Sequence, residues 1–310
     1  MEKGVINLRA MTRDSAATPE RRHHPSTIGI ALVAPTVGIF LGFAALPVIV
    51  VGVTSLADWT GFDLADVQWA GISNYSNLLT DEIFWRAFVN TLIFTVATTV
   101  LLNVVGYMLA LLVNTRVRGT GLLKFVVFLP VLLSPIIVGL MWSNLLGGAG
   151  GGVNVVLMQL GLTDAPIFFL GDPSWALFSI IAATVWQFAG YDMLLFYVGL
   201  QSVPKSLVEA ATLDGAKWFQ LQRYVVIPAM VPVISVVVLL NVIGGLRIFD
   251  VVYVMTRGGP NRATEVLATY MYELGFGINL MGPASAVAIV IVALAFVAAL
   301  VRSRVSLRDE

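Results

Sequence analysis

Long apolar stretches alternate with short polar segments along the chain. Four stretches, 23–57, 87–115, 125–163 and 274–301, contain no Asp, Glu, Lys or Arg, and two further apolar stretches carry a few charges. Because a helix needs about 20 apolar residues to cross the hydrocarbon core of a bilayer, the pattern predicts six membrane-spanning helices. Their expected positions are 28–56, 88–113, 122–146, 175–198, 229–255 and 282–301.

The polar ends of the chain, 1–27 and 306–310, are predicted to be cytoplasmic tails that flank a membrane domain of residues 28–305. With the N-terminus inside, the inner segments hold fourteen Lys and Arg residues and the outer segments hold three. The three outer residues are Arg86, Arg257 and Arg262. Because Lys and Arg are enriched in cytoplasmic loops, we expect both termini to lie in the cytoplasm.

The composition supports a membrane location and excludes several classes of protein. Apolar residues of the set AVILMFWYC make up 58% of the chain and charged residues 12%, whereas a soluble domain carries about 25% charged residues. This composition excludes a soluble enzyme and a disordered chain. The 18 basic and 18 acidic residues balance without a basic face, which argues against nucleic-acid binding.

Motifs that bind cofactors or perform catalysis are missing from the sequence. It contains no Cys, no G-x-x-x-x-G-K-[ST] phosphate loop, no H-E-x-x-H and no G-x-S-x-G. The Gly-rich run 147–152 lacks the lysine of a phosphate loop, so a turn is expected there. We therefore expect no catalytic residue, no metal site and no cofactor site in this chain.

The segment 204–228, between the fourth and fifth predicted spans, has the pattern of a helix–turn–helix. Ser206 followed by Glu209 fits a capping box, and Asp214-Gly215 is typical of a helix stop. A second helical stretch, which places Trp218, Leu221 and Tyr224 on one side, should then end at a proline. Such an element fits a groove on a partner protein and equally fits a helix that rests on the lipid surface.

The same segment resembles the EAA loop of the membrane subunits of bacterial ABC importers. The resemblance rests on Glu209-Ala-Ala-x-x-Asp214-Gly215-Ala216 and on Pro228 twelve residues further. This chain departs from the family at Gln222, where an aromatic residue is usual. The resemblance implies that the loop inserts into a cleft on a separate ATPase, and a purely structural role is the alternative. The residues implied in coupling are Glu209, Ala210, Ala211, Asp214 and Gly215.

A second resemblance points to the carbohydrate branch of these importers. The residues 249–264, which contain Gly258-Gly259-Pro260, and the later Tyr270-Met-Tyr272 are similar to the larger permease subunit of maltose importers and its relatives. The resemblance implies an all-α membrane bundle that binds sugar midway through the membrane, between two permease subunits. The residues at matching positions are Thr184, Gln187, Phe188, Tyr191, Gly244, Gly245 and Ile248.

Two of these residue types suit sugar recognition directly. Gln187 can exchange hydrogen bonds with hydroxyl groups, and the Tyr191 ring can cover an apolar sugar face. Gly244-Gly245 leaves room for a ligand or for a close helix neighbour, and in membranes small residues often serve helix packing.

Charged residues within apolar spans are costly and usually face a cavity or a partner. Arg247 and Asp250 are three residues apart, so on a continuous helix they can form an ion pair on one face. Contact with the substrate or a gating role is the alternative for this pair. Asp192 is expected to bind a sugar hydroxyl or to face a second subunit.

The resemblance also implies the partners of the chain. They are a second permease subunit that completes a heterodimer, a dimeric ATPase that carries ATP and Mg, and an extracytoplasmic sugar-binding protein, with the assembly held in a bacterial cytoplasmic membrane. ATP binding would close the ATPase and rock the permease pair. The alternatives are an ABC permease for another solute such as a glycerol phosphate, a secondary transporter, which should show inverted repeats, and a receptor or scaffold without transport.

Overall fold

The computed structural model describes residues 27–61, 63–115 and 119–306 of the chain. The two predicted tails therefore lie outside the described residues, except for Thr27 and Ser306. The chain divides into two compact units, residues 1–49 and 50–310. In the first unit, α1 (Thr27–Phe40) continues through a π-helical turn (Leu41–Ala45) into α2 (Leu46–Thr54), whose end belongs to the second unit.

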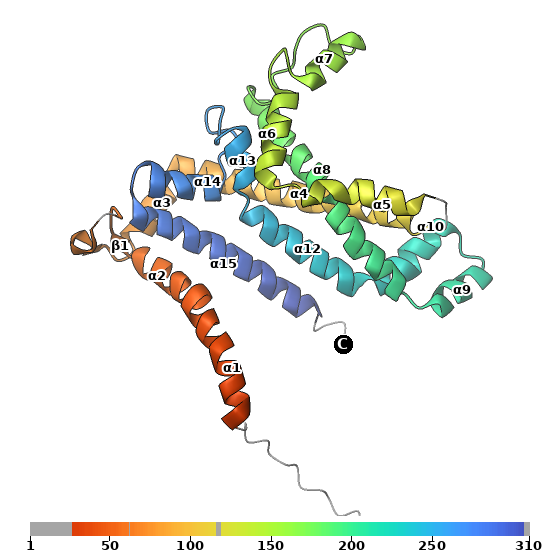
Figure 1. Cartoon of the computed structure of the whole chain (residues 1–310), viewed down its shortest axis with the longest axis horizontal. Helices are drawn as coiled ribbons and strands as arrows, with labels where there is room; N and C mark the ends of the chain where they lie inside the picture. The colour runs from red at the N-terminus through yellow and green to blue at the C-terminus, as the bar shows by residue number, and fades with distance from the viewer. Residues whose placement is uncertain (1–26, 62, 116–118, 307–310) are drawn as a thin grey trace, which may run out of the picture. The chain divides into compact units, whose positions relative to one another are not determined.

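Helices make up nearly all of the second unit (Figure 1). The long helices are α4 (Glu82–Val113), α8 (Pro173–Ser202), α12 (Val231–Leu246) and α15 (Met281–Ser306). The shorter ones are α3 (Ser73–Thr80), α5 (Thr120–Phe128), α6 (Pro135–Leu146), α7 (Gly152–Gln159), α9 (Lys205–Leu213), α10 (Trp218–Leu221), α11 (Ile227–Ala229), α13 (Asp250–Met255) and α14 (Leu267–Tyr272). The strands β1 (Ala57–Asp58) and β2 (Gln68–Trp69) form a small antiparallel ribbon.

The described helices can provide four to six membrane spans. Four are long and apolar enough to cross a bilayer, and two bent pairs raise the number to six if each pair crosses once. The four are Val33–Thr54, Glu82–Val113, Pro173–Ser202 and Met281–Arg304. The pairs are Thr120–Leu132 with Pro135–Leu146, bent by 97°, and Trp218–Ala229 with Val231–Leu246, bent by 74°.

Two of the predicted spans are not the continuous helices that the sequence analysis expected. The span 122–146 breaks at Ser134, because the proline that follows favours an extended backbone at the preceding residue and Ser134 has a ψ of 138°. The span 229–255 ends as a helix at Leu246, and a new helix begins at Asp250.

Acidic side chains mark the starts of the two longest helices. Asp81 accepts a hydrogen bond from the Ile83 backbone N–H at 2.8 Å, and Asp172 accepts one from the Ser174 N–H at 2.8 Å. Both are N-cap interactions, which satisfy a free backbone donor and favour the positive end of the helix dipole.

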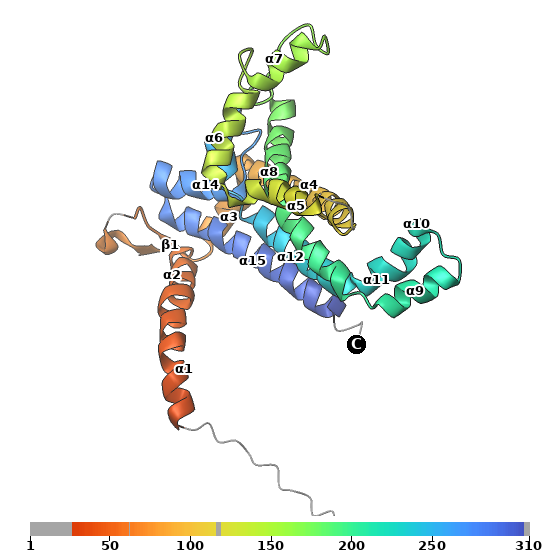
Figure 2. The same ribbon diagram turned by 45° about the vertical axis from the view of Figure 1, so that its right-hand side comes forward.

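Helix α4 packs against α8 and α12 in the centre of the second unit. A Cβ at Gly106 of α4 would lie 2.6 Å from the Asp192 Cβ of α8, so the two helices approach closely there. Small residues permit such approaches between membrane helices. Along α12, the helices α9 and α10 lie at one end and α13 and α14 at the other (Figures 1 and 2). The central helices therefore connect these two ends.

Candidate functional site

A cavity of about 480 Å³ lies between α4, α8 and α12, beside the break before α6. The structure brings together in its lining all seven residues that the sequence analysis placed on the substrate pathway. These are Thr184, Gln187, Phe188, Tyr191, Gly244, Gly245 and Ile248. Arg247 and Asp250 also line the cavity, whereas Asp192 does not. Four of the seven residues come from α8 and two from α12, while Ile248 lies in the break between α12 and α13, so the tertiary fold creates this cavity.

The sequence analysis missed nine further lining residues, among them the following four. Phe94 and Thr98 come from α4, Asn241 from α12, and Phe249 from the turn that precedes α13. Phe94 and Thr98 are four residues apart and so share one helix face. That face could be recognised in the sequence only if the packing partner of α4 were known.

Gln187 holds the broken helix that borders the cavity. Its side chain is 1% exposed, and its Nε2 donates a hydrogen bond to the Leu133 carbonyl oxygen at 3.0 Å. This carbonyl lies next to the break at Ser134, where no helical N–H is positioned to bind it. One amide hydrogen of Gln187 is therefore committed to the scaffold.

We predict that Gln187→Met destabilises the protein by about 1 kcal/mol, the typical strength of a hydrogen bond between membrane helices. Methionine preserves the length of the side chain but cannot donate to the Leu133 carbonyl. The melting temperature of the purified protein checks this, with Phe188→Leu at the neighbouring position as the control. An unchanged melting temperature for Gln187→Met would show that the hydrogen bond does not hold the break.

The two glycines of α12 differ in their surroundings. A Cβ at Gly245 would lie 2.8 Å from both the Cα and the Oγ1 of Thr95 on α4, whereas no atom lies within 4 Å of a Cβ at Gly244. Gly245 thus permits close helix packing, and Gly244 leaves open space in the cavity. Of the two roles considered from the sequence, room for a ligand therefore fits Gly244 and close helix packing fits Gly245.

The predicted ion pair between Arg247 and Asp250 is absent from the described part of the chain, where the ion pairs are those of Arg262 with Glu265 and Glu273. The prediction was wrong because it assumed one continuous helix. Arg247 follows the last residue of α12 and Asp250 begins α13, so the two residues do not share a helix face. Both side chains are exposed.

Asp192 is directed toward the interior of the bundle. It is 1% exposed, and its Oδ2 accepts a hydrogen bond from the Asn241 Nδ2 at 2.6 Å. Burial on this scale excludes the expected contact with a second subunit. Because Asn241 lines the cavity, Asp192 orients a cavity residue and does not itself line the cavity.

A helix–turn–helix occupies the segment between α8 and α12, as the sequence predicts. Helix α9 ends at Leu213, and Gly215 follows with a φ of +81°. The Gly215 N–H donates to the Thr212 carbonyl at 3.1 Å, and the Ala216 N–H donates to the Ala211 carbonyl at 3.0 Å. This pair of bonds is a Schellman motif, which favours glycine at the left-handed position.

Two details of this segment differ from the predictions. The capping box of Ser206 and Glu209 does not form, because α9 begins at Lys205 after Pro204 without a side-chain cap. Pro228 does not end the second helical stretch but lies in its last turn, in α11. The missing N–H of the proline costs little at this position, because α11 begins one residue earlier, after a π-helical turn. Of the three residues expected on one side, Trp218 and Tyr224 are 64% and 69% exposed, whereas Leu221 packs against the core.

The outward face of the helix–turn–helix combines exposed apolar and acidic groups. Leu213 is 89% exposed and Phe219 is 66% exposed. Among the described residues, no hydrogen bond or ion pair involves the side chain of Glu209 or Asp214. On the inner side, Gln222 accepts a hydrogen bond from the Tyr107 hydroxyl of α4 at 2.7 Å. The residue that departs from the EAA pattern therefore ties the loop to the bundle.

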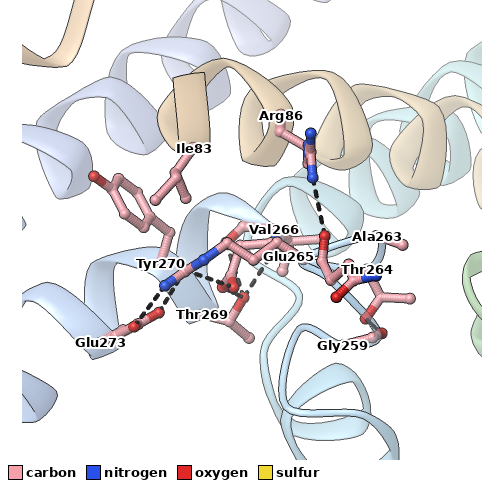
Figure 3. A network of polar contacts seen from close by, with 12 residues as sticks. Ile83, Arg86, Gly259, Ala263, Thr264, Glu265, Val266, Thr269, Tyr270 and Glu273 are labelled. Atoms are coloured by element: carbon pink, nitrogen blue, oxygen red, sulfur yellow. Dashed lines mark hydrogen bonds and ion pairs between the residues drawn. The ribbon is translucent and has the colours of Figure 1, made fainter. Parts of the chain in front are cut away.

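A polar network lies at the opposite end of α12, in the loop between α13 and α14 (Figure 3). Arg262 makes two hydrogen bonds to Glu273, at 2.7 and 2.9 Å, and one to Glu265 at 3.3 Å. From α4, Asn90 donates to the Ala263 and Glu265 carbonyls, and Arg86 donates to a carbonyl of the same loop. The loop is therefore fastened to the start of α4.

The Arg262 hydrogen bonds lower the pKa of the Glu273 carboxyl below its ordinary value of 4.5. Ionised Glu273 therefore stabilises the fold above pH 4.5, and this contribution is lost as the pH falls through the lowered pKa. Because both side chains are partly exposed, we expect it to be below about 1 kcal/mol. Glu273→Gln should lower the melting temperature at pH 7, and the difference from wild type should close below pH 4.5. A difference in melting temperature that stays constant with pH would contradict a stabilising role of ionised Glu273.

The chain is similar to membrane components of several transport systems. A sequence profile described as "Binding-protein-dependent transport system inner membrane component" matches residues 103–308. The trehalose/maltose transport system permease protein MalF of Thermococcus litoralis is 33% identical over 86% of this chain and 90% of that protein. The lactose transport system permease protein LacF of Rhizobium radiobacter is 33% identical over 80% of this chain and 83% of that protein.

Solved structures of one transport system resemble the fold over most of its length. A chain of a bacterial ABC transporter involved in the import of the acidic polysaccharide alginate superposes with a TM-score of 0.78 and 27% identity, covering 91% of this chain and 95% of that one. A second structure of an alginate ABC transporter, in complex with an alginate pentasaccharide-bound periplasmic protein, superposes with the same TM-score. The helical architecture described above is therefore that of an ABC transporter membrane subunit.

Proposed function

The chain belongs to the family of binding-protein-dependent transport system inner membrane components, and from this premise we propose that it is the permease subunit of an ATP-driven carbohydrate importer. It is a multi-pass membrane protein that provides half of the translocation pathway. The two relatives named above are permease proteins of a trehalose/maltose and of a lactose transport system. The charge distribution of the loops supports a topology with both termini in the cytoplasm.

The lining of the cavity between α4, α8 and α12 is the observation that supports a carbohydrate substrate. It combines the aromatic rings of Phe188 and Tyr191 with the amides of Gln187 and Asn241. Aromatic rings cover the CH faces of a sugar, and amides exchange hydrogen bonds with its hydroxyl groups. The charged groups among the described lining residues are one Arg and one Asp. A glycerol phosphate would require a more cationic lining, so a neutral sugar is favoured.

Energy for transport is proposed to come from a separate ATPase that binds ATP and Mg. The described residues contain no group of three or more His, Cys, Asp or Glu side chains that could hold a metal ion. The exposed side of α9 and α10, with Glu209 and Leu213, is suited to a protein groove because large exposed apolar side chains favour association. Closure of the ATPase would move this helix pair and, through Gln222 and Tyr107, the end of α4.

The proposed assembly pairs this chain with a second permease subunit and with an extracytoplasmic sugar-binding protein. The alginate transporter that resembles this fold was solved in complex with its periplasmic binding protein, which supports the last of these partners. In such an assembly each ligand shifts the inward-facing and outward-facing states only through its different affinity for them.

Affinity purification of the tagged chain from native membranes in a mild detergent tests this proposal. We expect a second permease, an ATPase with a phosphate-binding loop and a sugar-binding protein to co-purify. As a control, the same tag on an unrelated membrane protein should recover none of them. Recovery of the chain alone or as a homo-oligomer, at every detergent strength used, would contradict the proposal and favour a secondary transporter.

A further inference from the structure

A second cavity, of about 440 Å³, lies at the end of α12 that carries α13 and α14. Its wall includes the rings of Tyr253 and Tyr272. Around them lie the polar side chains of Arg257, Asn261, Glu265 and Glu273. In the proposed topology this end faces outward, toward the incoming substrate. Aromatic rings flanked by amide, guanidinium and carboxylate groups form a lining that can bind both the CH faces and the hydroxyl groups of a saccharide.

Aromatic rings connect this outer cavity with the first cavity. Phe249, which lines the first cavity, stacks on Tyr253 with ring centroids 5.1 Å apart and planes inclined by 17°. Tyr253 in turn contacts Tyr272, with centroids 5.2 Å apart. Because the two tyrosines line the outer cavity, a continuous aromatic surface reaches from one cavity to the other.

The backbone of the loop that borders the outer cavity is held in place before any ligand arrives. The backbone has positive φ angles at Arg257, Gly258, Asn261 and Arg262, and hydrogen bonds from Arg86 and Asn90 of α4 fasten the loop. Such preorganisation reduces the entropy lost on binding.

Arg257 has donors that the loop itself does not use. Its guanidinium carbon lies 5.9 Å from the Tyr253 ring centroid, and the side chain is exposed. Within the described residues no carboxylate forms an ion pair with it, because the ion pairs there belong to Arg262. A guanidinium beside an aromatic ring can donate to the hydroxyls of a sugar that lies on that ring.

We propose that the outer cavity is a second saccharide subsite, which holds a sugar on Tyr253 and Tyr272 before it passes along Phe249 into the first cavity. This inference rests on the proposed carbohydrate function. The competing explanation is that the rings form part of the contact with the second permease, because Tyr272 and Phe276 are 36% and 66% exposed.

Equilibrium dialysis of the purified permease–ATPase complex against radiolabelled maltose, trehalose and lactose tests the subsite. Wild type should bind at two separable sites. Tyr272→Leu should weaken one of them about 5- to 10-fold, the worth of one aromatic contact, and Arg257→Gln should weaken the same site. Tyr191→Leu, in the first cavity, should weaken sugar binding at the other site. Tyr272→Phe keeps the ring and should bind like wild type.

Phe276→Leu is the matched control, because Phe276 contacts Tyr272 with centroids 5.2 Å apart but does not line the cavity. Sugar binding that is unchanged in Tyr272→Leu and Arg257→Gln, while Tyr191→Leu reduces it, would overturn the subsite and leave the proposed function intact. Loss of the second permease from both the Tyr272→Leu and Phe276→Leu complexes, with sugar affinity intact, would assign the rings to the subunit contact. Absence of saturable binding of all three sugars to wild type would overturn the carbohydrate function together with the subsite.

Discussion

Glu209→Ala is expected to weaken binding of the partner ATPase at least about 30-fold and to abolish stimulation of its ATP hydrolysis. Removing one partner of a charged contact that is buried in an interface costs about 2–5 kcal/mol, and 2 kcal/mol corresponds to about 30-fold in affinity. The isolated permease should keep its melting temperature, because the described structure gives the exposed Glu209 side chain no hydrogen bond or ion pair within the chain. Affinity is measured by titrating the immobilised permease pair with the ATPase.

Glu82→Ala provides the control for this experiment. Glu82 is also an exposed acidic residue, but it lies in the first turn of α4, at the opposite end of that helix from Tyr107 and its partner Gln222. It should leave ATPase binding unchanged. Equal ATPase affinity in wild type and Glu209→Ala would show that α9 does not couple through this residue. A lowered melting temperature of the isolated Glu209→Ala permease would instead support the purely structural role.

Gly245→Ala is expected to destabilise the complex by up to about 3 kcal/mol, the upper part of the range for overpacking. The added methyl group would lie 2.8 Å from the Thr95 backbone, so α4 and α12 would have to separate. Thermal unfolding of the purified complex measures the change. The effect should be large because the contact is with backbone, which cannot rotate away as a side chain can.

Gly244→Ala is a closely matched control, since it makes the same chemical change one residue earlier in the same helix. A Cβ at this position meets no atom within 4 Å. Alanine favours a helix over glycine by about 0.5–1 kcal/mol, so the stability of this variant should be equal to wild type or slightly higher. Equal losses of stability in the two variants would contradict the close approach of α4 and α12 at Gly245.

The helical bundle and the membrane location could be predicted because both depend on local composition. Long uncharged stretches have few alternatives to membrane helices, and the Asp214-Gly215 stop reflects a backbone preference of glycine that holds in any context. The resemblance to importer permeases also identified seven of the residues that line the first cavity. That this cavity binds sugar, and that Glu209 contacts an ATPase, are proposals for the experiments above.

The errors arose where tertiary contacts decide local structure. The sequence analysis expected a continuous helix over 229–255 because no proline indicates the break at residues 247–249. This expectation led to the wrong ion pair of Arg247 with Asp250. Asp192 was assigned outward or ligand-facing roles, whereas a partner 49 residues away, Asn241, holds it inside the bundle. The lining residues of α4 were missed because which face of a largely apolar helix meets a cavity depends on its neighbours.

The energy source of transport is the most direct test of the central claim. The complete complex and its binding protein are reconstituted into proteoliposomes, and uptake of radiolabelled maltose, trehalose and lactose is followed. ATP on the ATPase side should drive uptake, its depletion should stop uptake, and ionophores that collapse ion gradients should have no effect. Uptake that continues without ATP and stops when the ion gradient collapses would contradict the account and identify a secondary transporter.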